Sequence, residues 1–159
     1  MIRTFRPGEE AYIAQSHYEF YNKEHQFDLS FKQFVQDGVE QFVKQYDSGK
    51  DGLWFVEVDG RIKGSIAISH VTASEAQLRW YFVEPDIAGR GYGRKLLEKA
   101  IWFCTDMRYE RITLWTNSKL TRARGLYAEY GFRIVESQEQ FLSNQMLVTE
   151  RWVKELPAE

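Results

Sequence analysis

The chain has 159 residues, of which 43% are apolar and 28% charged, and its formal net charge is −2. This length and composition predict a single domain over residues 1–159, and the scattered Lys and Arg residues argue against nucleic acid as a partner. No apolar run approaches the roughly 18 residues of a membrane span, and residues 1–7 lack a signal-peptide core. We therefore expect a cytoplasmic protein that does not bind membranes.

The N-terminal third is helical by pattern, after a short strand at residues 1–5. Aromatic and apolar residues over residues 9–23 predict the first helix. Residues 30–33, Ser-Phe-Lys-Gln, resemble a capping box and predict a second helix that continues to about residue 43. Most of the aromatic residues in these helices are expected in the core.

Three strands are predicted next. Residues 53–58 and 62–69 are joined by Asp59-Gly60, which is a strong signal for a two-residue hairpin turn. Residues 76–83 are rich in aromatic and branched side chains, and Pro85 ends this third strand because it cannot continue a ladder.

A glycine-rich turn follows the third strand and opens a helix. Glycines occupy positions 89, 91 and 93, and an apolar stripe at helical period follows at Leu96, Leu97, Ala100, Ile101 and Cys104. Glycine permits positive φ angles and close approach of a ligand, while the N–H groups of a helix N-terminus favour negative charge. The turn is therefore predicted to bind an anion such as a pyrophosphate.

Spacing separates the kinds of anion-binding loop. A P-loop requires Gly-Lys-Ser/Thr, whereas Gly93 is followed by Arg94 and Lys95. A dinucleotide-binding loop requires G-x-G-x-x-G, and neither Gly89 nor Gly91 begins that spacing. The pattern G-R-G-Y-G-R remains, with an ordinary tight turn as the plain alternative.

The last third predicts a strand at residues 111–116 and a short helix through Tyr127 that ends before Gly131. Two further strands are predicted at about residues 132–140 and 145–154. The single cysteine, Cys104, is expected as a core residue. The three histidines have no Cys pair and no H-x-x-x-H spacing, so no metal site is expected.

Two motifs carry a resemblance to a known family. The loop at residues 89–94 resembles the acetyl-coenzyme A loop of the GNAT superfamily of N-acetyltransferases. Residues 126–132, Leu-Tyr-Ala-Glu-Tyr-Gly-Phe, are similar to the L-Y-x-x-x-G-F ending of the same superfamily. A wider pattern resembles the acetyltransferase half of MarR–GNAT fusion proteins, at Leu78-Arg79, Val83-Glu84-Pro85, residues 114–117, Ala123-Arg124 and residues 131–133.

The resemblance implies a fold of the α/β (α+β) class. The sheet is expected to be mixed and mostly antiparallel, with six to seven strands and about four helices on both faces, which the order of elements also favours. In this fold the strands at residues 76–83 and 111–116 run parallel and splay apart. The resulting V-shaped slot takes the pantetheine arm of the cofactor, which pairs with the exposed edge of Phe82 and Val83.

The resemblance also implies transfer of an acetyl group from acetyl-coenzyme A to a primary amine of an unidentified small molecule or peptide. Tyr127 is expected to protonate the leaving thiolate, because a phenol with a reference pKa of about 10 is protonated at neutral pH. Backbone N–H groups are expected to hold the pyrophosphate, because Ala88 replaces the usual Arg or Gln. The expected cofactor-binding residues are Phe82, Val83, Ala88, Gly89, Arg90, Gly91, Tyr92, Gly93, Arg94 and Asn117.

The acceptor side is less constrained by the motifs. In the superfamily the first two helices and their link form a wall of the acceptor groove, which makes four residues candidate substrate contacts: Tyr18, Tyr21, His25 and Asp28. Some members carry a carboxylate on the loop-bearing strand, but the matching face offers Gln77 and Arg79 here. The general base therefore stays open between Glu75, Glu84 and a water chain.

Two other classes of protein share parts of these patterns. A non-catalytic module that binds or senses acyl-coenzyme A would keep the glycine loop but would not require Tyr127. An interaction domain would not bind coenzyme A at all. Dimers are frequent in the superfamily, so a homodimer is a further expectation from the resemblance.

Overall fold

The computed structural model describes residues 1–157. The elements in chain order are β1 (Ile2–Thr4), α1 (Ala11–His25), α2 (Leu29–Lys44), β2 (Gly52–Val58), β3 (Arg61–His70), β4 (Glu75–Val83), the short 3₁₀ helix η1 (Pro85–Ile87), α3 (Tyr92–Asp106), β5 (Arg111–Asn117), α4 (Thr121–Glu129), β6 (Arg133–Leu142) and β7 (Gln145–Glu155).

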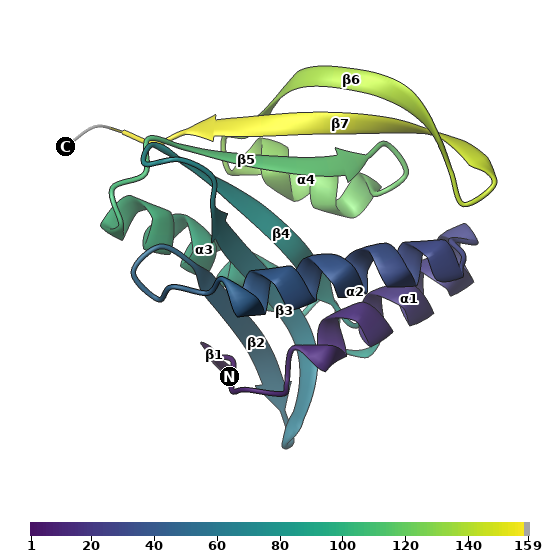
Figure 1. Ribbon diagram of the computed structural model, residues 1–159, viewed down its shortest axis with the longest axis horizontal. Coiled ribbons are helices and arrows are strands. Elements are labelled where there is room, and N and C mark those ends of the chain that lie inside the picture. Colours follow the sequence, from purple (N-terminus) through teal and green to yellow (C-terminus); the bar gives the residue numbers. More distant parts are fainter. Residues whose placement is uncertain (158–159) are drawn as a thin grey trace.

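The strands of these residues form one seven-stranded sheet in the order β1-β2-β3-β4-β5-β7-β6. Neighbouring strands are antiparallel except for β4 and β5, which run parallel. Helices α1 and α2 cover one face of the sheet, and α3 and α4 cover the other (Figure 1). The predicted mixed, mostly antiparallel sheet with helices on both faces is confirmed.

The turn chemistry of the sequence explains the first hairpin. Asp59 and Gly60 join β2 to β3, and both have positive φ angles, 52° and 76°. This backbone twist matches the right-handed twist of the flanking strands, which is why the pair is such a strong hairpin signal.

The start of α2 corrects one expectation. The helix begins at Leu29 with Asp28 as its N-cap, instead of at the predicted capping box of residues 30–33. The Asp28 carboxylate accepts a hydrogen bond from the Ser30 N–H at 3.0 Å. Asp28 thus satisfies one of the free N–H donors of the first turn, and Ser30 lies inside the helix instead of capping it.

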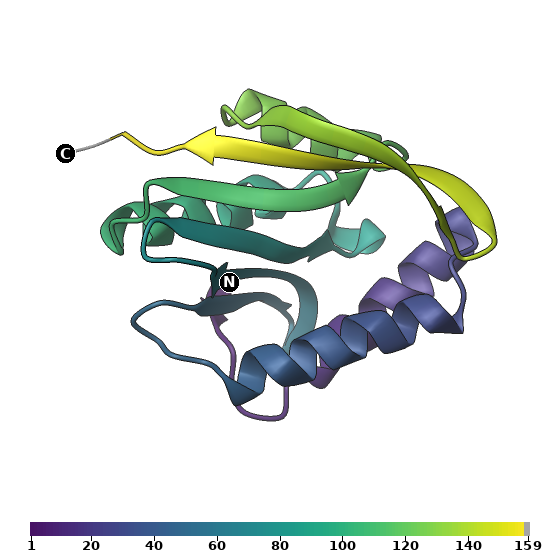
Figure 2. The same ribbon diagram turned by 45° about the horizontal axis from the view of Figure 1, so that its top comes forward.

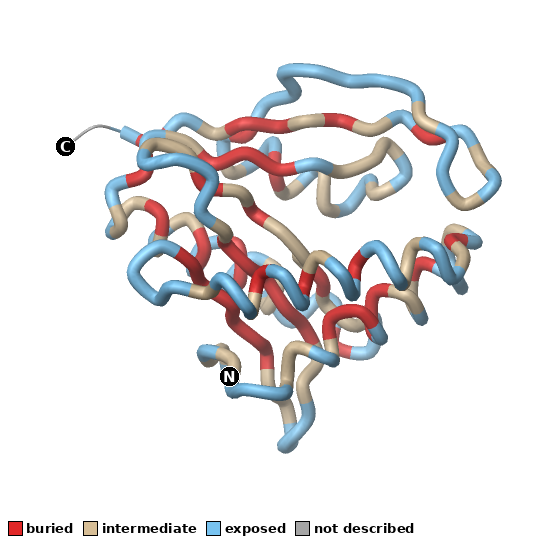
Figure 3. The backbone as a smooth tube through the Cα atoms, in the orientation of Figure 1, coloured by how far each residue is buried: buried red, intermediate tan, exposed pale blue. Residues whose placement is uncertain are grey.

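Alternate residues of the central strands fill two separate cores. On β2, Trp54 and Val56 pack on the α3 side of the sheet, whereas Leu53 and Phe55 pack on the α2 side. Figure 3 shows the buried residues running along the middle of the sheet. Cys104 of α3 is fully buried in the first core, as predicted, and burial raises the pKa of its thiol to about 12.

A β-bulge in β4 changes which side chains face which helices. Ser65 of β3 pairs with Phe82 and Ala67 pairs with Arg79, so β4 holds one extra residue between these pairs. Trp80 takes up the bulge with a φ of 49°, and its carbonyl accepts a hydrogen bond from the Ser65 hydroxyl at 2.7 Å. As a result, the Arg79 and Trp80 side chains both face α2.

The β6–β7 hairpin reaches across to the turn between α1 and α2 (Figure 2). The Gln145 side-chain amide donates a hydrogen bond to the His25 carbonyl at 2.7 Å, and the Ser143 hydroxyl donates to the Asp28 carboxylate at 3.2 Å. Leu147 is buried with aromatic residues of the same turn. No helix within residues 1–157 combines the length and apolar character needed to cross a membrane.

Candidate functional site

The glycine-rich loop between η1 and α3 presents unpaired backbone donors. Among the described residues, the N–H groups of residues 89–94 have no hydrogen-bond acceptor, and the first bond of the helix runs from Lys95 N–H to the Gly91 carbonyl at 3.1 Å. Gly91 is the N-cap of α3 with a φ of 87°, a conformation that costs an L-residue about 1–2 kcal/mol. These free donors and the helix dipole make the loop suited to an anion.

Gly93 is required for a different reason, namely close packing. The Tyr81 hydroxyl donates a hydrogen bond to the Gly93 carbonyl at 2.6 Å. A Cβ atom on Gly93 would lie 3.0 Å from that hydroxyl, closer than ordinary packing. Tyr81 therefore fixes the first turn of α3 against the end of β4.

The two parallel strands separate just before this loop. β4 and β5 pair only through Glu75–Gln77 and Arg111–Thr113. Beyond Gln77, β4 continues with β3 and β5 continues with β7, which leaves the edges of β4 and β5 that face each other unpaired. The expected splay is therefore present, and the backbone of Phe82 and Val83 borders the opening.

A cavity of about 790 Å³ occupies this opening and extends to the end of α1. Its volume falls within the range of small-molecule and cofactor sites. It is lined by the end of β4, the glycine loop, the first turn of α3, one face of α4 and the last turns of α1. The sequence-predicted residues that it brings together are Phe82, Val83, Ala88, Gly89, Gly91, Tyr92, Gly93, Arg94, Tyr21 and His25.

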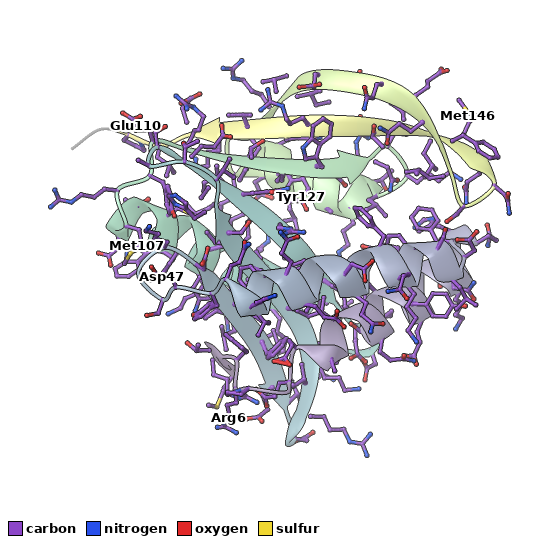
Figure 4. All side chains as sticks on the ribbon, viewed as in Figure 1. Arg6, Asp47, Met107, Glu110, Tyr127 and Met146 are labelled. Atoms are coloured by element: carbon purple, nitrogen blue, oxygen red, sulfur yellow. The ribbon has the colours of Figure 1, made fainter. Side chains whose placement is uncertain are left out.

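Tyr127 of α4, labelled in Figure 4, is only 5% exposed and is not a lining residue itself, but it packs on Tyr81, which lines the cavity. Its ring packs against Tyr81, Phe132 and Trp152, with ring centroids 5.8–6.0 Å apart. Burial raises the pKa of the Tyr127 hydroxyl well above its ordinary value, and nearby Tyr21 and Tyr81 raise it further. Within residues 1–157 this hydroxyl makes no hydrogen bond, so it is a protonated donor without a partner.

A buried ion pair holds α4 in place. Arg124 donates two hydrogen bonds to the Glu150 carboxylate of β7, at 2.8 and 2.9 Å, and the Trp152 indole N–H donates a third at 3.1 Å. Burial alone would raise the pKa of Glu150, but these hydrogen bonds hold it below its ordinary value. The pair fixes the helix that carries Tyr127.

Aromatic side chains form the end of the cavity at α1. Phe20 packs on Phe82 with ring centroids 5.3 Å apart, and Tyr21 stacks on the His25 imidazole at 6.0 Å. Burial, together with the charge of Lys119, lowers the pKa of His25. His25 is therefore a neutral imidazole at pH 7 on the cavity wall.

Neither carboxylate considered as the general base, Glu75 or Glu84, lines the cavity. The Glu84 carboxylate accepts a hydrogen bond from the Tyr12 hydroxyl at 2.5 Å and lies 3.6 Å from the Lys63 ammonium. Glu75 is the first residue of β4, at the closed end of the V. The one carboxylate among the described lining residues of the cavity, Glu129, is paired with Arg94 at 2.5 Å.

Besides Tyr127, four predicted residues do not line the cavity: Arg90, Asn117, Tyr18 and Asp28. Arg90 is exposed. Asn117 accepts a hydrogen bond from the Lys119 N–H at 3.0 Å, and the Lys32 ammonium lies over the Tyr18 ring at 5.5 Å. Asp28 caps α2. These contacts are structural, and ligand roles for the four residues stay predictions.

Several lining residues were not anticipated. Lys119, Arg122, Ala123 and Leu126 line the cavity from the start of α4. The lining there also includes Leu120, Thr121, Gly125 and Glu129, so it is the turn before α4 and most of the helix, which no periodic pattern marks. Tyr81 could not be found from periodicity either, because the bulge at Trp80 changes the alternation of β4. No cluster of His, Cys, Asp and Glu that could hold a metal ion is found in the described part of the chain.

Comparisons with known proteins agree with this geometry. Residues 13–132 match the model of the acetyltransferase (GNAT) family. An uncharacterized N-acetyltransferase, YjgM of Escherichia coli, is 28% identical over 102 residues, which span 62% of this chain and 60% of that protein. An uncharacterized N-acetyltransferase of Archaeoglobus fulgidus is 32% identical over 94 residues, 55% of this chain and 64% of that protein. The matched region thus covers less than two thirds of either curated relative.

Among solved structures, an acetyltransferase from Streptococcus agalactiae superposes with a TM-score of 0.79 and 25% identity, covering 98% of both chains. A GNAT family acetyltransferase from Elizabethkingia anophelis, whose crystal structure has acetyl-coenzyme A bound, matches with a TM-score of 0.59 and 18% identity over 74% of this chain and 83% of that one. The second likeness concerns the fold alone.

Proposed function

This chain belongs to the acetyltransferase (GNAT) family, and we propose that it transfers an acetyl group from acetyl-coenzyme A to a primary amine of a small molecule or peptide. The observation that carries the proposal is the row of unpaired N–H groups at residues 89–94 beside a cavity of about 790 Å³. A diphosphate at the loop and a long, narrow arm in the cavity would match both features.

The chain has groups suited to each part of acetyl-coenzyme A. The backbone N–H groups of residues 89–94 would hold the pyrophosphate. The free edge of β4 at Phe82 and Val83 would pair with the pantetheine amides. Arg122 lines the cavity and makes no ion pair with the described carboxylates, so it is available for a phosphate. Bound there, acetyl-coenzyme A supplies an acetyl group activated as a thioester.

The proposed reaction is a direct attack of the neutral amine. A C–N bond forms as the C–S bond breaks, and Tyr127 donates its proton to the departing sulfur. A backbone N–H at Phe82 or Val83 stabilises the negative charge that develops on the carbonyl oxygen. The amine loses one proton, and Tyr127 regains one from solvent.

We assign the acceptance of that amine proton to His25, directly or through water. Glu75 and Glu84 were the carboxylate candidates, but both lie away from the cavity lining. The lowered pKa of His25 keeps its imidazole neutral, as a proton acceptor must be. The alternative is that water alone accepts the proton; the pH profile of a His25→Gln variant distinguishes the two.

Replacing Tyr127 by Phe tests the central assignment. The Tyr127→Phe enzyme should lose about 100-fold or more in kcat, because general acid catalysis is removed. Its affinity for acetyl-coenzyme A, measured by calorimetry, should stay within about twofold because the ring and its packing remain. Tyr130→Phe is the matched control, since the Tyr130 hydroxyl bonds to Glu98 on the surface.

Amine acceptors would be screened by detecting released thiol. Unchanged turnover in Tyr127→Phe would refute the proton-donor role. A protein that binds acetyl-coenzyme A but acetylates no amine would be the sensor module, and one that does not bind it would be an interaction domain. The finer resemblance to MarR–GNAT fusion proteins, the single domain, the cytoplasmic location and the homodimer stay predictions.

A further inference from the structure

A second cavity lies on the α2 side of the sheet. Its volume is about 390 Å³, and it is bounded by the end of α2, the loop to β2, the end of β3 and the middle of β4. We call it the Arg79 cavity after the arginine that lines it. Its other charged side chains are Lys50, Asp47 and Asp51, and its neutral polar side chains are Gln41, Gln45, Gln77, Ser69 and His70. Gln77 and Arg79 precede, on the same strand, the residues 81–83 that line the larger cavity.

Arg79 is a half-buried cation without a counter-ion. No hydrogen bond or ion pair joins its guanidinium to any residue from 1 to 157. Three other partly buried arginines, Arg3, Arg124 and Arg151, each meet a glutamate carboxylate at 2.7 or 2.8 Å. Burial lowers the pKa of Arg79, as expected for a cation that lacks such a partner.

The position of the guanidinium is fixed by its surroundings. It lies over the Trp80 ring, 4.2 Å from the ring centroid, and that ring packs edge-on against Phe42 of α2. A Cβ atom on Gly38 would lie 2.9 Å from one of the Arg79 nitrogens. The glycine therefore leaves room for the guanidinium, and the bulge at Trp80 brings its supporting ring beneath it.

Both acidic side chains of the lining, Asp47 and Asp51, accept hydrogen bonds from backbone N–H groups; Asp47 accepts one from Gly49 at 2.9 Å. Asp51 accepts hydrogen bonds from the His70 N–H at 2.8 Å and the Asp47 N–H at 2.9 Å. The rest of the polar lining is three amides, a hydroxyl, the Lys50 ammonium and the His70 imidazole. A planar guanidinium with free N–H groups, beside a second cation, Lys50, and several amides, matches a carboxylate in shape and charge.

We propose that the Arg79 cavity binds a carboxylate of the acceptor, so that the acceptor is an amino acid or short peptide with its amine and carboxylate well separated. Arg79 and Phe82 are three residues apart on β4, a span on the order of 10 Å. A tripeptide covers about this distance between its ends. This inference rests on the proposed function, because it places the amine at the opening beside Phe82.

Triglycine and triglycinamide form the matched pair of probes, since they differ only in the terminal carboxylate. The wild-type enzyme should prefer triglycine by about 10- to 100-fold in kcat/KM, as expected for a charge-assisted hydrogen bond. In Arg79→Gln the preference should fall to about one, mainly through a higher KM for triglycine. Arg79→Lys should keep part of it, and Arg151→Gln, on the same face of the sheet, should keep all of it.

Calorimetry of the same peptides gives a readout that does not depend on turnover. Triglycine should bind wild type more tightly than triglycinamide, and Arg79→Gln should remove the difference while its melting temperature shows that it is folded. If acetyl-coenzyme A binds and amines are acetylated without a carboxylate preference, this inference is wrong and the proposed function stands. If acetyl-coenzyme A does not bind, the proposed function fails, and the assignment of the acceptor fails with it.

A free anion is the other source of the same chemistry. Inorganic phosphate and acetate would be titrated against wild type and Arg79→Gln in a thermal-shift assay. Competition of these anions with triglycine, but not with triglycinamide, would support the proposal. Stabilisation by phosphate that needs Arg79, with equal binding of the two peptides, would overturn it in favour of an independent anion site.

Discussion

The His17 imidazole lies against the Phe82 ring, with ring centroids 5.2 Å apart, so a buried histidine of α1 supports the strand that borders the main cavity. Its Nδ1 lies 2.8 Å from the Ile13 carbonyl, which makes Nδ1 the donor and leaves Nε2 as the unprotonated nitrogen. His17 is 4% exposed, and burial lowers its pKa to about 4.

This burial predicts a loss of stability in mild acid. An unfolded chain protonates His17 with a pKa of about 6.5, whereas the folded protein does so only near pH 4, so between these values the unfolded state binds the extra proton. The free energy of unfolding should therefore fall as pH drops from 7 to 5, by about 2 kcal/mol from this residue. Urea unfolding of wild type and His17→Gln at both pH values measures it, and parallel pH dependence in the two proteins would contradict it.

Two Arg–Glu pairs that both involve β7 differ in how far the glutamate is buried. Comparing them therefore tests how burial of the carboxylate changes its contribution to stability. Glu150→Gln, in the buried pair with Arg124, should lower the free energy of unfolding by about 1–3 kcal/mol. Glu136→Gln, in the pair with Arg151 whose carboxylate is half exposed, should cost less than about 1 kcal/mol. Because only the first pair fixes α4, only Glu150→Gln should also lower kcat, and equal effects of the two variants would contradict this role.

Two glycine-to-alanine substitutions are expected to act with opposite signs. Gly91→Ala should destabilise the protein by about 1–2 kcal/mol and weaken acetyl-coenzyme A binding, because a φ of 87° is strained for alanine. Gly125→Ala, inside α4, should stabilise it by about 0.5–1 kcal/mol, because no atom lies within 4 Å of the new Cβ. Thermal unfolding of both variants gives the signs, and a stabilised Gly91→Ala would show that this residue is not held left-handed.

The assignment of His25 predicts the shape of the pH profile. Activity should decline below the His25 pKa, which lies under 6.5 because of burial and the nearby Lys119. Lys119→Gln removes that charge, so the pKa of His25 and the acid limb of kcat/KM should both move to higher pH. His25→Gln should lose the limb, and NMR titration of the His25 ring would check the pKa without activity. If neither substitution changes the acid limb of the kcat/KM profile, water accepts the amine proton instead of His25.

Much of the fold could be predicted because its signals are local. The Asp59-Gly60 turn, the break at Pro85 and the glycines before α3 each specify their own backbone, and every strand and helix that they bound is present. The start of α2 was wrong by two residues because Asp28 and Ser30 are both good caps, and the choice between them depends on the geometry of the turn before the helix.

The acceptor side could not be predicted because its signals are not local. A left-handed Trp80 has no sequence signature, yet it decides that Trp80 faces α2 beside Arg79 and that Tyr81 faces the α3 side. Likewise, nothing near Glu84 in the sequence indicates that Tyr12, far earlier in the chain, holds its carboxylate away from the cavity. For this reason Glu75 and Glu84, which strand position alone suggested as bases, do not line the cavity.

The burial of Cys104 has a practical consequence for measuring turnover. It is the chain's one cysteine, it has no exposed surface, and its thiol is protonated at any working pH. Thiolate-directed reagents such as disulfide dyes require an accessible, ionised sulfur. The folded protein should thus contribute no background colour, and an endpoint reading before and after denaturation would count released coenzyme A separately from the enzyme's own sulfur.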